Sequence, residues 1–148
     1  MSPRRLPLIP FVHETLAMQL ELADARRVPV QARLSYDSDD PFAVTAAFSH
    51  EGRILALWRL DRQMLAEGTR RPVGEGDVRL RPQRVGARSV LRIELSGSAQ
   101  DGTGREHAVV LAPAHAVVSF VERTYGVVAP GREDVSVDEF LADLMTRG

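Results

Sequence analysis

The sequence predicts an α+β fold in which a single domain contains two halves, each an antiparallel strand meander followed by a helix. Two observations predict this layout. Four segments with alternating apolar residues are joined by short turns and precede a short helical segment, and a second set of such segments precedes further helices. The chain of 148 residues is also long enough to bury one core. Residues 1–10, with three prolines, are expected to form a flexible N-terminal extension, and residues 11–148 a single domain.

The first four strands follow from apolar residues at every second position. Residues 12–22 and 28–36 alternate in this way, and the acidic segment DSDDP at 37–41 predicts a turn before the third strand. Pro29 has no N–H for a sheet ladder, so we expect it at a strand start or on a sheet edge. The fourth strand, 53–60, is largely apolar on both faces. The third strand is expected to direct four side chains inward: Phe42, Val44, Ala46 and Phe48.

Capping residues predict three helices. Asp61 is suited to cap a helix over 62–67, with Gly68 as its C-terminal stop. Pro113 is expected at the first position of a second helix, which keeps helical spacing until Gly126. Ser136-Val137-Asp138-Glu139 is a capping box that predicts a final amphipathic helix. The strands of the second half are expected between the first two helices, at 77–82, 89–97 and 107–112.

The composition limits the possible functions. Cysteine is absent, which excludes disulfides and thiolate chemistry, and 19 basic against 20 acidic residues argue against a whole-surface partner such as duplex DNA. All basic residues are arginine and asparagine is absent, which indicates a GC-rich genome, so arginine is partly a default choice. The first apolar run is too short and too proline-broken for a signal peptide, and no stretch suits a membrane span. A cytoplasmic protein is therefore expected.

No enzyme signature is visible, so we expect no catalytic residues, cofactor or metal. The four histidines lack metal-ligand spacing and are interpreted as structural or solvated. The motif Gly-x-Ser-x-Gly is absent, although a Ser-His-Asp triad could still assemble in space. Asp37, Asp39 and Asp40 resemble part of a calcium loop, but its sixth position is Phe42 and not glycine. An acidic turn is the simpler interpretation, and an acidic surface for a partner is the alternative.

The segment LAEGTRRPVGEGDVRLRP at 65–82 is the densest candidate for binding. Its glycines precede a strand, so it is not a phosphate cradle at a helix N-terminus. Ten arginines against four acids between Arg53 and Arg92 suit nucleic acid, but Trp58 is the only aromatic residue there, so stacking partners are lacking. We therefore expect an arginine-rich surface for an acidic protein partner. The candidate partner-binding residues are Arg70, Arg71, Arg79, Arg81, Asp37, Asp39 and Asp40.

Several of these segments together resemble the SsgA-like family of actinobacterial sporulation and cell-division proteins, closest to its SsgB type. The resemblance extends over about residues 14–147, and the segments are specific as a set. The matching positions are Tyr36-Asp37, Asp40-Pro41-Phe42-Ala43-Val44, Phe48, Trp58, 65–68, Arg71-Pro72, Gly74, 76–78, Pro82 and the segment LAPAHAVVSFVERT at 111–124.

The resemblance implies a non-enzymatic role in sporulation-specific septation, in which the protein recruits the tubulin-like division protein FtsZ to division septa. It also implies a Whirly-like fold, a homotrimer, and other SsgA-like family members as partners. The likeness to Whirly-type proteins keeps single-stranded nucleic-acid binding as the alternative function, because a fold alone does not set function. A hydrolase that acts on the cell wall is a third alternative, which the lack of an export signal disfavours.

Overall fold

Both strand-and-helix halves are present in the computed structural model, which describes residues 11–98 and 105–133. The first half contains β1 (Phe11–Glu21), β2 (Arg27–Asp37), β3 (Ala43–His50), β4 (Arg53–Asp61) and helix α1 (Arg62–Gly68). The second half contains β5 (Val73–Glu75), β6 (Val78–Val85), β7 (Arg88–Ser98), β8 (Arg105–Pro113) and helix α2 (Ala114–Tyr125). The capping box at Ser136, the final helix and the N-terminal extension lie outside the described residues.

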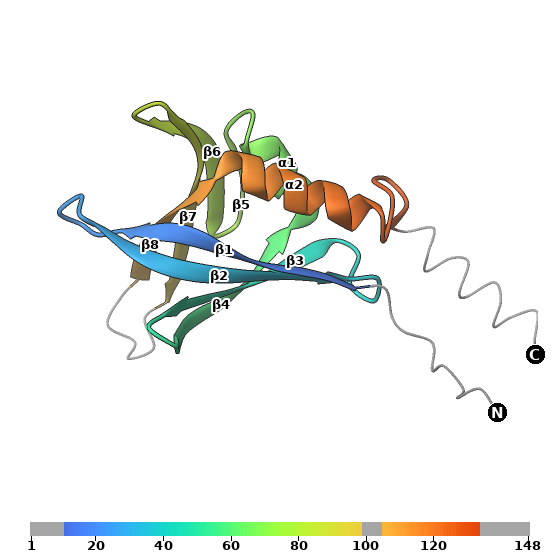
Figure 1. Ribbon diagram of the computed structural model, residues 1–148, viewed down its shortest axis with the longest axis horizontal. Helices are drawn as coiled ribbons and strands as arrows, with labels where there is room; N and C mark the ends of the chain where they lie inside the picture. Colours follow the sequence, from blue (N-terminus) through green and yellow to red (C-terminus); the bar gives the residue numbers. More distant parts are fainter. Residues whose placement is uncertain (1–10, 99–104, 134–148) are drawn as a thin grey trace, which may run out of the picture.

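The described strands form one eight-stranded sheet in the order β4-β3-β2-β1-β8-β7-β6-β5. Each half is an antiparallel meander, as the short turns predict. The halves join where β1 pairs with β8, from Gln19 opposite Leu111 to Glu21 opposite Val109. Figure 1 shows that the sheet is strongly curved and that both helices lie on the same side of it. The sheet therefore has two edges, the long strand β4 and the short strand β5.

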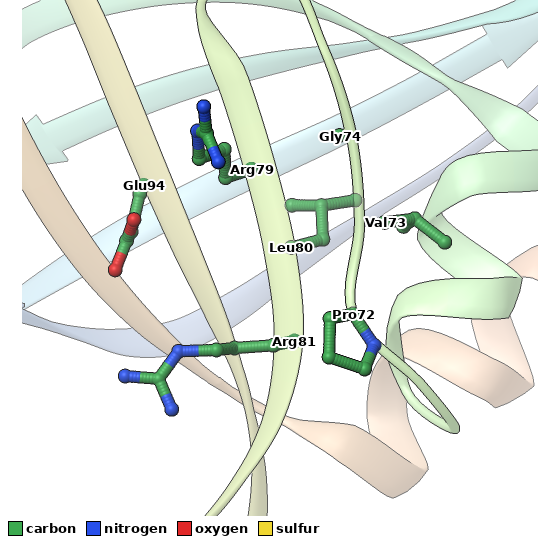
Figure 2. Close-up of a pocket in the computed structure, with 7 residues that line it drawn as sticks. All are labelled: Pro72, Val73, Gly74, Arg79, Leu80, Arg81 and Glu94. Carbon is green, nitrogen blue, oxygen red and sulfur yellow. The ribbon is translucent and has the colours of Figure 1, made fainter.

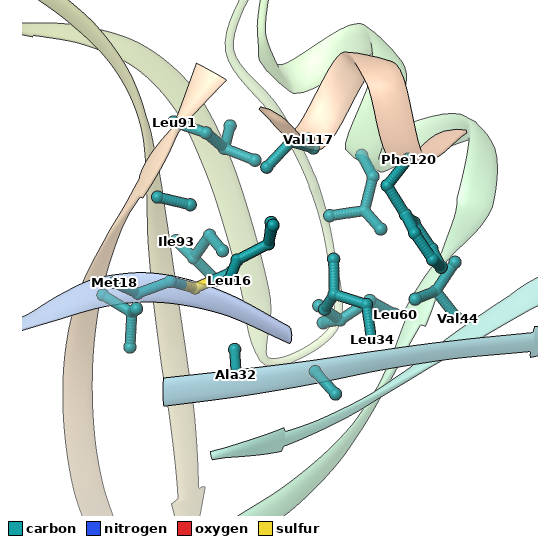
Figure 3. Close-up of a cluster of buried hydrophobic side chains, with 14 of the residues drawn as sticks. Leu16, Met18, Ala32, Leu34, Val44, Leu60, Leu91, Ile93, Val117 and Phe120 are labelled. Carbon is teal, nitrogen blue, oxygen red and sulfur yellow. The ribbon is translucent and has the colours of Figure 1, made fainter. Parts of the chain in front are cut away.

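The core confirms the period-two alternation, because successive strand residues point to opposite faces of a sheet. In β2 the inward residues Val30, Ala32, Leu34 and Tyr36 are all buried, and polar residues occupy the positions between them. Helix α2 covers this face with Val117, Phe120 and Val121, at the helical spacing that the sequence shows. Figure 3 shows side chains from strands of both halves meeting below Val117 and Phe120.

Two expectations about β2 and β3 need correction. Phe42 precedes β3 and is 47% exposed, because the chain is still in the turn there and has not entered the alternation of the strand. Pro29 is the third residue of β2, a strand with neighbours on both sides. It nevertheless costs no bond in the β2–β3 ladder, since that ladder begins only at Gln31.

The boundaries of the two helices also differ from the expectation. The Asp61 carboxylate caps α1 as predicted, accepting a hydrogen bond from the Met64 N–H at 2.9 Å. Gly68, however, is the buried last residue of α1 and not a stop beyond it. A Cβ atom there would lie 2.6 Å from the Leu80 Cβ, so glycine is needed for close packing of α1 on β6. Pro113 is the N-cap residue of α2, one position before the expected one.

A buried arginine joins the two helices. Arg62, the first residue of α1, is 2% exposed, and its guanidinium lies 5.0 Å from the ring centres of both Tyr36 and Tyr125. It donates hydrogen bonds to the Val128 carbonyl at 2.6 Å and to the Glu133 carboxylate at 2.5 Å. It also donates to the Thr124 carbonyl in the last turn of α2 at 3.3 Å, where a cation is favourable, so Arg62 stabilises the C-terminal end of that helix. The start of α1 is thus tied to the segment that follows α2.

Candidate protein-interaction surface

The strand arginines predicted from the sequence lie on the outer face of the second half. Arg79 and Arg81 are exposed on β6, while Leu80 between them is buried in the core. Figure 2 shows both arginine side chains on the side of β6 that faces Glu94 of β7. We call the surface formed by Arg79, Arg81, Arg92 and Glu94 the arginine face. A hollow of about 400 Å³ adjoins it and is lined on the β5 side by Pro72, Val73 and Gly74.

Arg92 organises the charges of the arginine face. Its guanidinium donates hydrogen bonds to Glu94 and to Glu21, both at 2.8 Å, and to Gln83 at 3.2 Å. The hydrogen bond from Arg92 is the main reason that the pKa of Glu94 lies below its ordinary value, against the opposing effect of partial burial. Glu94 is therefore ionised and bound by Arg92. Arg79 and Arg81 form no ion pair with any residue of the described part of the chain.

Arg70 and Arg71 follow α1 and precede β5, at the same edge of the sheet. The Arg71 guanidinium donates to the Glu67 carboxylate at 2.9 Å, one helical turn earlier. This hydrogen bond is the largest cause of the lowered pKa of Glu67. Arg70 is exposed and forms no ion pair within the described ranges. Of these two candidates, Arg70 is the one whose charge is available to a partner.

The three aspartates form the predicted turn between β2 and β3. The Asp37 carboxylate accepts hydrogen bonds from the backbone N–H groups of Asp39 at 2.8 Å and Asp40 at 3.2 Å, which holds the turn closed. Asp40 forms a bidentate ion pair with Arg59 of β4, with N–O distances of 2.6 and 2.9 Å. Asp39 stays exposed. The structure therefore gives Asp37 and Asp40 internal partners and leaves Asp39 as the acidic candidate.

The acidic turn and the arginine stretch are closer than the sequence suggests. Phe42 and Arg59 line one side of a hollow of about 300 Å³, and Glu75 and Val78 of the β5–β6 hairpin line another. The hollow lies where the two edges of the curved sheet approach each other. None of the seven candidate residues lines it, so it does not bring the aspartates onto the arginine face.

The histidines have structural partners or are exposed. His50 is partly exposed, and its Nδ1 lies 2.8 Å from the Pro29 carbonyl oxygen. Ser96 and His107 are opposite each other on β7 and β8 and share a hydrogen bond of 3.1 Å on an exposed face. Among the described residues, no group of three or more His, Cys, Asp or Glu side chains is placed to hold a metal ion.

Strand β4 presents a second kind of surface, at the other edge of the sheet. Ile54, Leu55 and Leu57 are 70%, 55% and 66% exposed. They lie beside an apolar hollow of about 750 Å³, to which Leu55 and Leu57 contribute together with Phe48, Trp58, Leu95 and Val110. A long apolar edge strand with unpaired backbone groups is a site where another chain can pair. This edge is therefore suited to association.

A family comparison assigns the chain. The family described as Streptomyces sporulation and cell division protein, SsgA, matches residues 30–133, which run from β2 to Glu133, where the described residues end. The chain belongs to the SsgA family. This family is a sporulation and cell-division family and not a known enzyme family.

Individual members of the SsgA family are similar over most of the chain. The sporulation-specific cell division protein SsgB of Streptomyces coelicolor is 39% identical over 80% of this chain and 82% of the relative. The SsgB protein of Saccharopolyspora erythraea is 38% identical over 90% of this chain and 92% of the relative. The solved structure of the SsgA-like sporulation-specific cell division protein from Thermobifida fusca has a TM-score of 0.77 at 30% identity, covering 94% of this chain and 98% of that one.

More distant structures share only the fold. The solution structure of outer surface protein E has a TM-score of 0.54 at 5% identity. The curved antiparallel sheet with its helices is thus the SsgA-family fold, while the Whirly-like comparison stays a prediction. The comparisons do not support the single-stranded nucleic-acid alternative. In the described ranges, no helix has the length and apolar character needed to cross a membrane.

Sequence reasoning found the arginine face but not its internal organisation. The alternation of β6 placed Arg79 and Arg81 on one face, whereas the pairing of Arg92 with Glu21 joins residues that are 71 positions apart. The exposed edge of β4 was also missed as an interaction surface. Its signal was present, because the segment 53–60 is apolar on both faces and only one face of an antiparallel strand is needed for the core.

Proposed function

We propose that this chain is a non-enzymatic, sporulation-specific cell-division protein that helps to position the septum by recruiting the tubulin-like division protein FtsZ. The proposal rests first on its 39% identity to a sporulation-specific cell division protein, over most of both chains. In this proposal the protein acts as an adaptor at division septa. An adaptor needs a surface for its client and a means of displaying it, and the two edges of the sheet differ in a way that suits these two tasks.

The edge at β5 is the proposed client surface. Arg79, Arg81 and Arg70 are exposed and form no ion pairs within the described part of the chain, so their charges are available to an acidic partner. Arg71 contributes less, because it is bound to Glu67. Asp39 is the acidic residue left exposed by the turn. Asp37 and Asp40 act by holding that turn in place.

Charge reversal at the start of the client surface should weaken recruitment. We expect Arg70→Glu with Arg71→Glu to lower the affinity for FtsZ filaments about tenfold or more, because two attractive charges become repulsive. Co-sedimentation with FtsZ measures the effect. Arg33→Glu is the matched control, since Arg33 is an exposed arginine on β2, which is not an edge of the sheet. Unchanged co-sedimentation of the folded double variant would remove Arg70 and Arg71 from the site, and failure of the unaltered protein to co-sediment would overturn the proposed recruitment of FtsZ.

The edge at β4 is the proposed surface for self-association. We infer a homo-oligomer, a trimer by the family resemblance, in which β4 is covered by another copy or by another SsgA-family member. Covering Ile54, Leu55 and Leu57 would remove a large apolar area from water, and each such side chain is worth about 1.5–3 kcal/mol when fully buried. The oligomer would display several client surfaces at once, which raises the avidity for a filament.

A charge on β4 should separate the copies. Leu57→Asp is expected to weaken self-association about tenfold or more, because a carboxylate would be buried against apolar residues. Sedimentation velocity over a range of concentrations measures the effect. Phe42→Asp is the control, since Phe42 is also a half-exposed apolar residue but lies outside β4. A monomeric unaltered protein, or an oligomer that persists in Leu57→Asp, would contradict this assignment of the surface.

A further inference from the structure

The arginine face has an excess of positive charge that its own strands do not neutralise. Glu94 lies between the arginines of β6 and β7, but its carboxylate is already bonded to Arg92, which also binds Glu21. Arg79 and Arg81 have no ion-pair partner in the part of the chain that the structure describes. They occupy alternate positions of one strand, so their side chains leave the same face about 7 Å apart. The face therefore presents two cations at the spacing of alternate residues in a β-strand.

The neighbouring strand β5 is an edge of the sheet formed by the described strands, and it has little side-chain bulk on the arginine face. Among the described strands it pairs with β6 alone, and Gly74 lies opposite Arg79 in that pairing. On this face Gly74 of β5 has no side chain, and Pro72, which precedes β5, places only its short ring near Arg81, as Figure 2 shows. Val73 and Glu75 alternate with Gly74, although Val73 still lines the edge of the hollow and Glu75 lines a smaller one together with Arg79. The result is the hollow of about 400 Å³ between the strand edge and the two arginines.

We propose that β5 and the arginine face bind an extended acidic segment of a protein partner, which adds to the sheet beside β5. Backbone pairing with the edge strand supplies affinity, as in other complexes formed by strand addition. Carboxylates at alternate positions of the added strand have the same spacing as Arg79 and Arg81. Both arginine side chains lie toward β7 in the structure, so binding would turn them toward β5, and Gly74 opposite Arg79 leaves a path without a side chain. The inference rests on the proposed function only for the identity of the partner.

Charge complementarity selects both this edge of the sheet and this occupant. The β4 edge carries Ile54, Leu55 and Leu57, so an acidic strand does not suit it. A nucleic-acid strand also carries regular negative charges, but binding without base pairing depends on aromatic stacking. The residues of the arginine face and of the adjoining hollow include no aromatic side chain. The surface therefore favours a peptide over a nucleic acid.

The test uses the full chain and a fluorescent peptide of about twelve residues in which glutamate alternates with threonine, with a peptide of the same composition arranged in two blocks as control. We expect the alternating peptide to bind more tightly than the block peptide. Arg79→Glu or Arg81→Glu should weaken its binding about tenfold or more, and Arg33→Glu on β2 should not change it. Gly74→Val keeps both arginines and should also weaken binding, because the new side chain lies between them and the edge. Amide hydrogen exchange at residues 73–75 should slow when the peptide is bound.

The inference would be overturned by any of these results: no binding of the alternating peptide, equal binding of the block peptide, unchanged binding by both arginine variants, exchange at β5 that the peptide does not slow, or tighter binding of an oligothymidine of equal charge. If Gly74→Val does not fold, the two arginine variants and the exchange measurement still decide the question. Co-sedimentation with FtsZ is measured in parallel. A protein that binds the peptide but not FtsZ keeps this inference and loses the proposed partner, and a protein that binds FtsZ but not the peptide does the reverse.

Discussion

Replacing Arg62 with leucine is expected to lower the free energy of unfolding by about 3–5 kcal/mol, because removing one partner of a buried ion pair leaves the other uncompensated. The variant would remove the hydrogen bonds to the Val128 carbonyl and the Glu133 carboxylate and the contacts with two tyrosine rings. Denaturant unfolding measures the loss. Arg59→Leu is the matched control, since Arg59 also pairs with a carboxylate but is largely exposed, and we expect only a small change there. A similar effect of both substitutions would contradict the role of Arg62.

The pH dependence identifies the carboxylate involved. Burial alone would raise the pKa of Glu133, but hydrogen bonds from Arg62 and from the backbone outweigh it and hold the pKa below its ordinary value. A group with a lowered folded-state pKa contributes stability at neutral pH and loses it as the pH falls through that pKa. The difference in stability between the unaltered protein and Glu133→Gln should therefore be largest near neutral pH and shrink in acid. A difference that is constant with pH would assign the effect to packing and not to charge.

Gly68→Ala is expected to destabilise the protein by about 1–3 kcal/mol, although alanine is the better helix former. The new Cβ would lie 2.6 Å from the Leu80 Cβ and 3.2 Å from a Leu91 methyl group, so α1 would have to move away from β6. The melting temperature measures the effect, and Gly97→Ala is the matched control. A Cβ at Gly97 meets no atom within 4 Å, and its φ is not positive, so that substitution should be neutral. A rise in stability of Gly68→Ala would mean that helix propensity outweighs the contact.

The sequence predicts most of the fold because most of the fold is set by local pattern. The strands of the first half alternate along their whole length, and Asp61 caps α1 through a residue only three positions away. Strand β5 could not be predicted in the same way. It has three residues, including Gly74, and lies between a proline and a turn, so only its pairing with β6 makes it a strand. Local composition there favours a turn, and tertiary pairing overrides it.

Some features of the candidate surface could likewise be predicted from the local pattern, and others depend on contacts between distant residues. Exposure of Arg79 and Arg81 follows from the alternation of β6 alone, whereas the loss of Asp40 as a free charge depends on Arg59, a residue brought close by strand pairing. The Arg71–Glu67 pair is the exception, because residues four apart on a helix are neighbours and the pair could have been predicted. Nothing in the sequence around Arg62 indicates that this residue is buried and joins the two helices. Its partners Tyr36, Tyr125 and Glu133 converge only when both helices are in place.

The pairing of β1 with β8 has a consequence for biosynthesis. The strand that emerges first among those described is completed on one side only by the strand that emerges last, with Gln19 opposite Leu111. Until that late segment leaves the ribosome, the early meander has two unprotected borders instead of one. Contacts between residues so far apart in sequence also slow the search for the native state. Nascent chains of this protein are thus exposed to aggregation through most of translation, and rapid completion of the chain protects them.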